Sequence, residues 1–239
     1  MSFIITLYVR EGIVMASDSR LTLNVSKKQE EKSLVQVAVG QSDSNYKTFL
    51  TPNNIGISAF GAADIDGSPL AGYVESFINQ NCQKPGIDVG DVADKLMRFF
   101  SGFNTTPDCG FHVAGYNKAG KNLEQNVWHV SVKNKQTRLL NAQNKPGASW
   151  AGEGDILARL VQPTWLKDKQ GNYIQQPTHQ VPWQFFTLQD AIDFAVYAVR
   201  TTIDSIRFQP RPKTVGGPID VLVIKPDKSF WVKRKELHV

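Results

Sequence analysis

The order in which strand-like and helix-like runs follow one another most restricts the fold of this sequence. Alternating β-branched and apolar residues predict a strand hairpin over residues 2–17 and a second strand pair over 47–60. Two helical periodicities come next, followed by strands, then helices, then two final strands. Runs of one element type, without strict βαβ alternation, favour a layered α+β fold. We therefore expect a four-layer αββα sandwich, in which two stacked antiparallel sheets are covered by helices on both outer faces.

The ends of individual elements are predicted from local signals. Thr187 resembles a helix N-cap, because the acid Asp190 follows at the third helical position. Apolar residues then recur on one face, which predicts a long helix to about residue 206. The other expected elements are helices at about 67–82, 88–101 and 154–162, and strands at about 109–116, 126–132, 136–142, 219–224 and 229–234.

Nothing in the chain has the composition of a linker, so residues 1–239 are expected to form one domain. Two stretches fall outside the layered pattern. Residues at about 24–44 are polar around one short apolar strand, which predicts an exposed β-excursion. Residues 163–186 are rich in Pro and Gln and lack periodicity, which predicts a surface insertion.

The net charge of +5 is spread along the chain. Its densest basic run, Lys233-Arg234-Lys235, is expected to be a solvated end of the chain. Because a nucleic-acid-binding surface interleaves clustered basic residues with aromatic ones, no nucleic-acid partner is expected.

The apolar runs are shorter than the roughly 18 residues that a membrane span needs. The first residues also lack the basic-then-apolar layout of a signal peptide. A cytoplasmic protein without a membrane partner is therefore expected. Its two cysteines, Cys82 and Cys109, are expected to be free buried thiols.

The residue that follows Met1 is a candidate nucleophile. If Met1 is removed, Ser2 carries both a hydroxyl and a free α-amine. The α-amine has an ordinary pKa of about 7.7–8.0, so it can serve as the base for its own hydroxyl at neutral pH. Neither a GxSxG elbow nor a triad or metal-ligand spacing is found among the four histidines, which are His112, His129, His179 and His238. No metal and no other cofactor is therefore expected.

A serine of this kind needs a nearby cation that favours the ionised hydroxyl and the free amine. Lys47, at the start of a predicted strand, is the candidate cation, and Asp18 is its candidate partner. In an antiparallel hairpin, the start of the first strand lies beside the end of the second, so Ser2 and Asp18 are expected to be neighbours. Backbone N–H groups at Phe60-Gly61 are candidates for an oxyanion hole, because glycine permits close approach of a substrate.

Together these segments resemble the catalytic β subunits of proteasomes, which are N-terminal nucleophile hydrolases. In that family a threonine begins the first strand, and a G-[VI]-V-x-A-x-D-S-R segment, a K-x-F segment and an A-G-G-x-x-D-like turn follow. The corresponding stretches of this chain are Ser2, Gly12–Arg20, Lys47–Phe49 and Ala59–Asp64.

The second half of the chain extends the resemblance. Phe111–Tyr116 resembles the central strand of that fold, and Gly152-Glu153 and Val215–Asp220 are most similar to the bacterial ancestral-beta-subunit group, called Anbu. The resemblance implies that Asp204, near the end of the long helix, orients the amine and hydroxyl of the nucleophile.

The chain departs from the family pattern at three places. Ser2 stands where the family has Thr, which removes the methyl group that restricts the rotamer. Glu153 stands where classical β subunits have a serine that assists the N-terminus, and Anbu-like chains resemble this one there. Phe60 occupies the first glycine position of the oxyanion turn.

The resemblance implies a peptidase or amidase that cleaves peptides or proteins through an acyl-enzyme. It also implies a homo-oligomer, either a ring or an open spiral, and leaves an ATPase partner open. Two alternatives remain: a non-catalytic assembly or binding subunit of the same fold, and an N-terminal nucleophile hydrolase acting on a small amide. If Met1 stays attached, the Ser2 nitrogen is an amide and cannot act as the base.

Overall fold

We analysed a computed structural model of the chain, which describes residues 2–29, 33–120 and 122–237. Met1 and His238, both named above, lie outside the described residues. Every strand pair in the described part is antiparallel. The helices and the strands occur in separate runs along the chain, which confirms the α+β class.

The strand that follows Ser2 lies inside a five-stranded sheet, which we call sheet 1. Its order is β12-β1-β2-β15-β16, so β1 has a hydrogen-bonded neighbour on each side. The β1 and β2 strands are fully buried along their length, as expected for central strands with few charged residues. The strands of sheet 1 are β1 (Phe3–Val9), β2 (Gly12–Ser17), β12 (Gly147–Gly152), β15 (Asp220–Ile224) and β16 (Ser229–Lys233).

A second five-stranded sheet, sheet 2, has the order β11-β10-β9-β6-β5. Its strands are β5 (Thr48–Leu50), β6 (Gly56–Gly61), β9 (Cys109–Ala119), β10 (Asn122–Ser131) and β11 (Gln136–Leu139). The helices are α1 (Leu70–Asn81), α2 (Val89–Ser101), α3 (Asp155–Val161) and α4 (Leu188–Arg207), with a short 3-10 turn at Trp183–Phe185.

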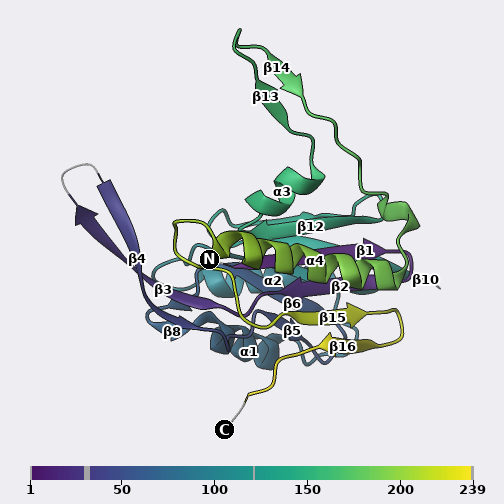
Figure 1. The fold of residues 1–239 in the computed structure, drawn as a ribbon. Helices are drawn as coiled ribbons and strands as arrows, with labels where there is room; N and C mark the ends of the chain where they lie inside the picture. The colour runs from purple at the N-terminus through teal and green to yellow at the C-terminus, as the bar shows by residue number, and fades with distance from the viewer. Residues whose placement is uncertain (1, 30–32, 121, 238–239) are drawn as a thin grey trace.

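Three hydrophobic clusters show how these elements pack (Figure 1). In the first, residues of sheet 2 such as Phe111 pack against α1 and α2. In the second, residues of sheet 1 such as Phe3 pack against α3 and α4. In the third, Met15 of sheet 1 meets Val127 of sheet 2. Each sheet therefore contacts helices on one face and the other sheet on its opposite face.

Two hairpins project from this body (Figure 1). The first, β3 (Leu21–Gln29) with β4 (Ser33–Ser42), occupies the predicted β-excursion but has two long strands where one short strand was expected. The second, β13 (Trp165–Lys167) with β14 (Tyr173–Gln175), lies in the predicted surface insertion. A two-residue strand pair, β7 (Asp64–Ile65) with β8 (Ser68–Pro69), precedes α1.

The β12 strand was missed from the sequence. Its residues, GASWAG, are mostly small and lack the β-branched side chains that mark strands. The strand is specified by pairing with β1, where Phe3 lies opposite Gly152 and Tyr8 opposite Gly147. In the described residues, no helix is long and apolar enough to cross a membrane.

Candidate functional site

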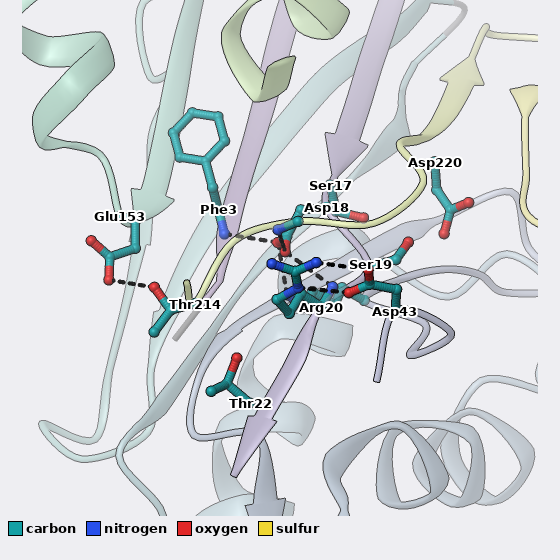
Figure 2. Close-up of polar contacts among 12 residues, drawn as sticks. Phe3, Ser17, Asp18, Ser19, Arg20, Thr22, Asp43, Glu153, Thr214 and Asp220 are labelled. Carbon is teal, nitrogen blue, oxygen red and sulfur yellow. Dashed lines mark hydrogen bonds and ion pairs between the residues drawn. The ribbon is translucent and has the colours of Figure 1, made fainter. Parts of the chain in front are cut away.

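The site lies where the β1–β2 hairpin opens. Ser2 immediately precedes β1, and Asp18 immediately follows β2. Two hydrogen bonds join these ends. The Asp18 N–H donates to the Phe3 carbonyl at 3.3 Å, and the Phe3 N–H donates to the side-chain oxygen Oδ1 of Asp18 at 3.0 Å. Figure 2 shows Asp18 beside the backbone nitrogen of Phe3, with a dashed line joining the two. The hairpin thus places a carboxylate beside the first residue of the described chain.

The Asp18 carboxylate is fully buried and accepts four hydrogen bonds. Oδ1 accepts from Phe3 and, at 2.7 Å, from the Lys47 ammonium. Oδ2 accepts from the backbone N–H of Arg20 at 3.1 Å and from that of Gly216 at 3.0 Å. Because both oxygens are saturated with donors, a buried charge is tolerated here and its orientation is fixed.

Lys47 immediately precedes β5, and its side chain is only 4% exposed. Burial lowers the pKa of its ammonium below the usual value, and the nearby charge of Lys235 lowers it further. The charge of Asp18 and its hydrogen bond oppose this shift. Lys47 therefore holds its proton less tightly than an exposed lysine does.

Ser2 itself is buried and shares a small pocket with Lys47. Its carbonyl oxygen accepts a hydrogen bond of 2.8 Å from the backbone N–H of Glu153. Gly152 precedes that residue with φ of +86°, and a Cβ added to it would lie 1.8 Å from the Ser2 carbonyl oxygen. Only glycine fits there, because any side chain would collide with the Ser2 backbone. The other residues lining the pocket are Asn45, Tyr46, Ala59, Ala62, Ala63, Leu70 and Ala71.

A second buried carboxylate borders the site. Glu153 is 8% exposed and accepts hydrogen bonds from the Thr214 hydroxyl at 2.9 Å and from Arg211 Nη1 at 2.8 Å. Figure 2 shows the Glu153–Thr214 contact to one side of Asp18. Together with the backbone bond to Ser2, these contacts tie the start of β1 to the loop that follows α4.

The same loop is fixed from the other side by Arg20. The Arg20 guanidinium makes a bidentate contact with Asp43, with Nε–Oδ1 and Nη2–Oδ2 distances of 2.6 and 2.7 Å. A Cβ added to Gly216 would lie 2.4 Å from the guanidinium carbon of Arg20. Glycine at this position therefore lets the backbone approach Arg20 closely and aim its N–H at Asp18.

Two of the sequence-predicted site residues lie apart from this cluster. Asp204 is an exposed residue of α4 and, among the described residues, it has no hydrogen bond or ion pair with Ser2, Asp18 or Lys47. The helix turns its apolar face to sheet 1, so Asp204 points to solvent. Gly61 ends β6 with φ of +93°. It does not line the Ser2 pocket itself, but the next two residues, Ala62 and Ala63, do.

One ion pair near the site was missed, and the expectation for Lys235 was wrong. The Lys235 ammonium contacts the buried Asp220 carboxylate, and its side chain is 4% exposed, so this residue does not belong to a solvated end. Lys233 and Arg234 are exposed, as expected for that end. The sequence offered one signal: Asp220 lies in the apolar run IDVLVI, and an acid in a buried strand requires a partner.

The remaining polar and thiol groups of the core give no sign of a metal centre. Within the described ranges, no three residues among His, Cys, Asp and Glu gather closely enough to hold a metal ion. Cys82 and Cys109 are free and buried, and burial raises the pKa of their thiols to about 11 and about 12. Burial, with a smaller contribution from His129, lowers the pKa of His112 to about 3, so this histidine is neutral at pH 7.

Comparisons with known proteins do not assign this chain to a family. No family model matches the chain, and no curated protein matches its sequence. The arrangement itself is a serine beside a buried lysine–aspartate pair, which is a setting that can activate a hydroxyl if a free amine is present.

Proposed function

We propose that the chain is an N-terminal nucleophile hydrolase of the proteasome β-subunit type, closest to the Anbu group, with Ser2 as its nucleophile. One observation carries the proposal: Asp18 Oδ1 accepts from both the Lys47 ammonium and the Phe3 N–H, beside a pocket that Ser2 and Lys47 share. The stacking of two antiparallel sheets between helices is compatible with the four-layer sandwich of these hydrolases.

The proposed reaction requires cleavage of the peptide bond before Ser2. The freed α-amine then accepts the hydroxyl proton as Ser2 Oγ attacks the substrate carbonyl. That proton passes to the leaving amine, an ester joins the acyl group to Ser2, and water hydrolyses the ester. The Lys47 ammonium favours the unprotonated amine because like charges lower its pKa. The backbone N–H of Gly61 is the proposed donor to the oxyanion, since the next N–H, that of Ala62, already donates to the Asp108 carbonyl.

One role is reassigned relative to the sequence resemblance. Because Asp204 faces solvent, we propose that Glu153 orients the N-terminal end of β1. Its backbone N–H binds the Ser2 carbonyl, and its carboxylate is anchored by Thr214 and Arg211. The pocket beside Ser2 is lined largely by small apolar side chains, including Ala59, Ala63 and Ala71.

The proposal includes assembly with further copies of the same chain. The β13–β14 hairpin projects from the body (Figure 1) and exposes large apolar side chains; Trp165 is 54% and Tyr173 72% exposed. Contact with a second copy would bury these groups, and each fully buried large apolar side chain contributes about 1.5–3 kcal/mol.

The test is the intact mass of the protein before and after treatment with a peptide epoxyketone, a probe that needs both a hydroxyl and its own α-amine. The chain is produced behind a cleavable leader whose removal leaves Ser2 as the first residue. We expect one adduct on the natural sequence, one on the matched variant Ser44→Ala, in which an exposed serine is changed, and none on Ser2→Ala. Absence of an adduct from chains that begin at Ser2 would favour a non-catalytic scaffold of the same fold.

A further inference from the structure

The C-terminal segment delivers a buried cation to the neighbourhood of Ser2. After β16 the chain turns inward, and the Lys235 ammonium contacts the Asp220 carboxylate. The Lys235 N–H also donates to Asp220 Oδ1 at 2.8 Å. The two side chains are only 4% and 0% exposed. An exposed, solvated tail would not fix a lysine at both its backbone and its ammonium.

The ion pair lies next to both halves of the Ser2 site. Asp220 pairs across the sheet with Ser17, the residue immediately before Asp18. The Lys235 ammonium lies 4.3 Å from the ring centre of Tyr46, which precedes Lys47 and lines the Ser2 pocket. The Tyr46 hydroxyl also donates to the Lys235 carbonyl at 3.4 Å. The C-terminal segment therefore contacts Tyr46, which forms one wall of the pocket.

Three charged groups act on Lys47. Asp18 and Asp43 are negative, and both favour the charged form of Lys47. Lys235 is positive and disfavours it. Around Lys235 itself, Asp220 and Asp18 favour its charge, whereas burial and the adjacent Arg234 oppose it. The two lysines and the two buried carboxylates thus form one coupled group, in which changing one charge alters the others.

We propose that Lys235 is a positioning residue of the Ser2 site, which acts on Lys47 through its charge and on the pocket wall through Tyr46. The inference rests on the proposed function for its catalytic meaning, whereas the placement of Lys235 beside the site rests on its contacts with Asp220 and Tyr46. With Asp220 it forms a pair of zero net charge, so each partner masks part of the field of the other. Removal of either partner exposes the charge that remains.

This arrangement predicts shifts of opposite sign. In Lys235→Met, the pKa of Lys47 rises, because the positive charge that disfavours its ammonium is removed and the negative charge of Asp220 is left unpaired. In Asp220→Asn, the unpaired Lys235 ammonium lowers it further. The double variant removes both charges and is expected to stay close to the natural protein. Each single shift is expected to be about one pH unit.

The measurement is the pKa of Lys47 from NMR titration of lysine side chains, with its signal assigned by comparison with Lys47→Arg. Lys233→Met is the matched control, because Lys233 is an exposed lysine two residues away in the chain. The pH dependence of epoxyketone addition to Ser2 is recorded on the same samples. We expect the acidic limb of this pH–rate profile to move to higher pH in Lys235→Met and to stay in place in Lys233→Met.

Three results separate the possibilities. An unchanged Lys47 pKa in both single variants, or a shift of the same sign in both, would overturn the inference. A shifted pKa with no adduct in the natural protein would refute the proposed function while leaving the coupling established. If Lys235→Met alone fails to fold, the downward shift expected in Asp220→Asn decides the question.

Discussion

Replacing Asp18 by Asn should reveal how much the buried ion pair contributes. The substitution removes the negative charge that pairs with Lys47, whose side chain is 4% exposed. It also replaces one carboxylate oxygen, which accepts hydrogen bonds, by an NH₂ group that faces the donors around Asp18. Breaking one side of a buried ion pair costs about 3–5 kcal/mol. Because a domain has a total stability of about 5–15 kcal/mol, we expect Asp18→Asn to remove a large part of it.

The loss should depend on pH in a defined direction. Burial already places the pKa of Lys47 in the folded protein below its ordinary value, so between these two values the unfolded chain binds more protons. Stability therefore rises with pH across that window. Without Asp18 the folded-state pKa falls further, the window widens, and the variant should gain more stability between pH 7 and 10 than the natural protein does.

Urea unfolding followed by tryptophan fluorescence at several pH values measures both effects. The control is Asp108→Asn, which breaks the exposed ion pair Lys133–Asp108, whose side chains are 64% and 74% exposed. That change should cost at most about 1 kcal/mol. A loss for Asp18→Asn that equals the control, or a stability that does not rise with pH, would show that the pair is not desolvated as described.

Three further predictions concern the backbone, the core and the assembly. Gly61→Ala should lower the free energy of unfolding in urea by at least about 2 kcal/mol more than Gly67→Ala does. Both glycines have positive φ, but only a Cβ at Gly61 would meet a backbone carbonyl, at 2.5 Å. Equal losses in the two variants would contradict this. Because burial lowers the pKa of His112 to about 3, the natural protein should lose up to about 1.4 kcal/mol per pH unit as pH falls from 6.5 toward 4, and His112→Gln should flatten that slope. Changing Trp165 and Tyr173 to Ser should lower the mass measured by light scattering, whereas a mass that stays at one chain in every sample would refute the proposed assembly.

Local signals in the sequence predicted local structure well. The N-cap at Thr187 is present with both hydrogen bonds of a capping box, because the threonine and Asp190 satisfy each other's backbone N–H groups. The hairpin over residues 2–17 is present, and its register explains why Asp18 lies beside Ser2. In each case the residues that give the signal and the residues that form the structure are close together in the sequence, so no distant partner had to be known.

Features set by distant partners were not predictable in this way. The β12 strand lacks strand-forming side chains and exists because β1 pairs with it. Asp204 was assigned from the family resemblance, yet the rotation of α4 against sheet 1 turns it to solvent. Lys235 belongs to a basic run that is typical of an exposed tail, and only the buried Asp220 gives it a different environment.

The position of β1 between β12 and β2 also has a consequence during translation. The β1 strand is made well before its surroundings: β12 begins only at Gly147, the loop that donates to Asp18 arrives with Gly216, and Lys235 comes later still. Long-range pairings of this kind form only after the distant strand has been made. A nascent chain therefore carries Ser2 without its surroundings, and any reactivity of this serine would arise only after Gly216 and Lys235 have been made.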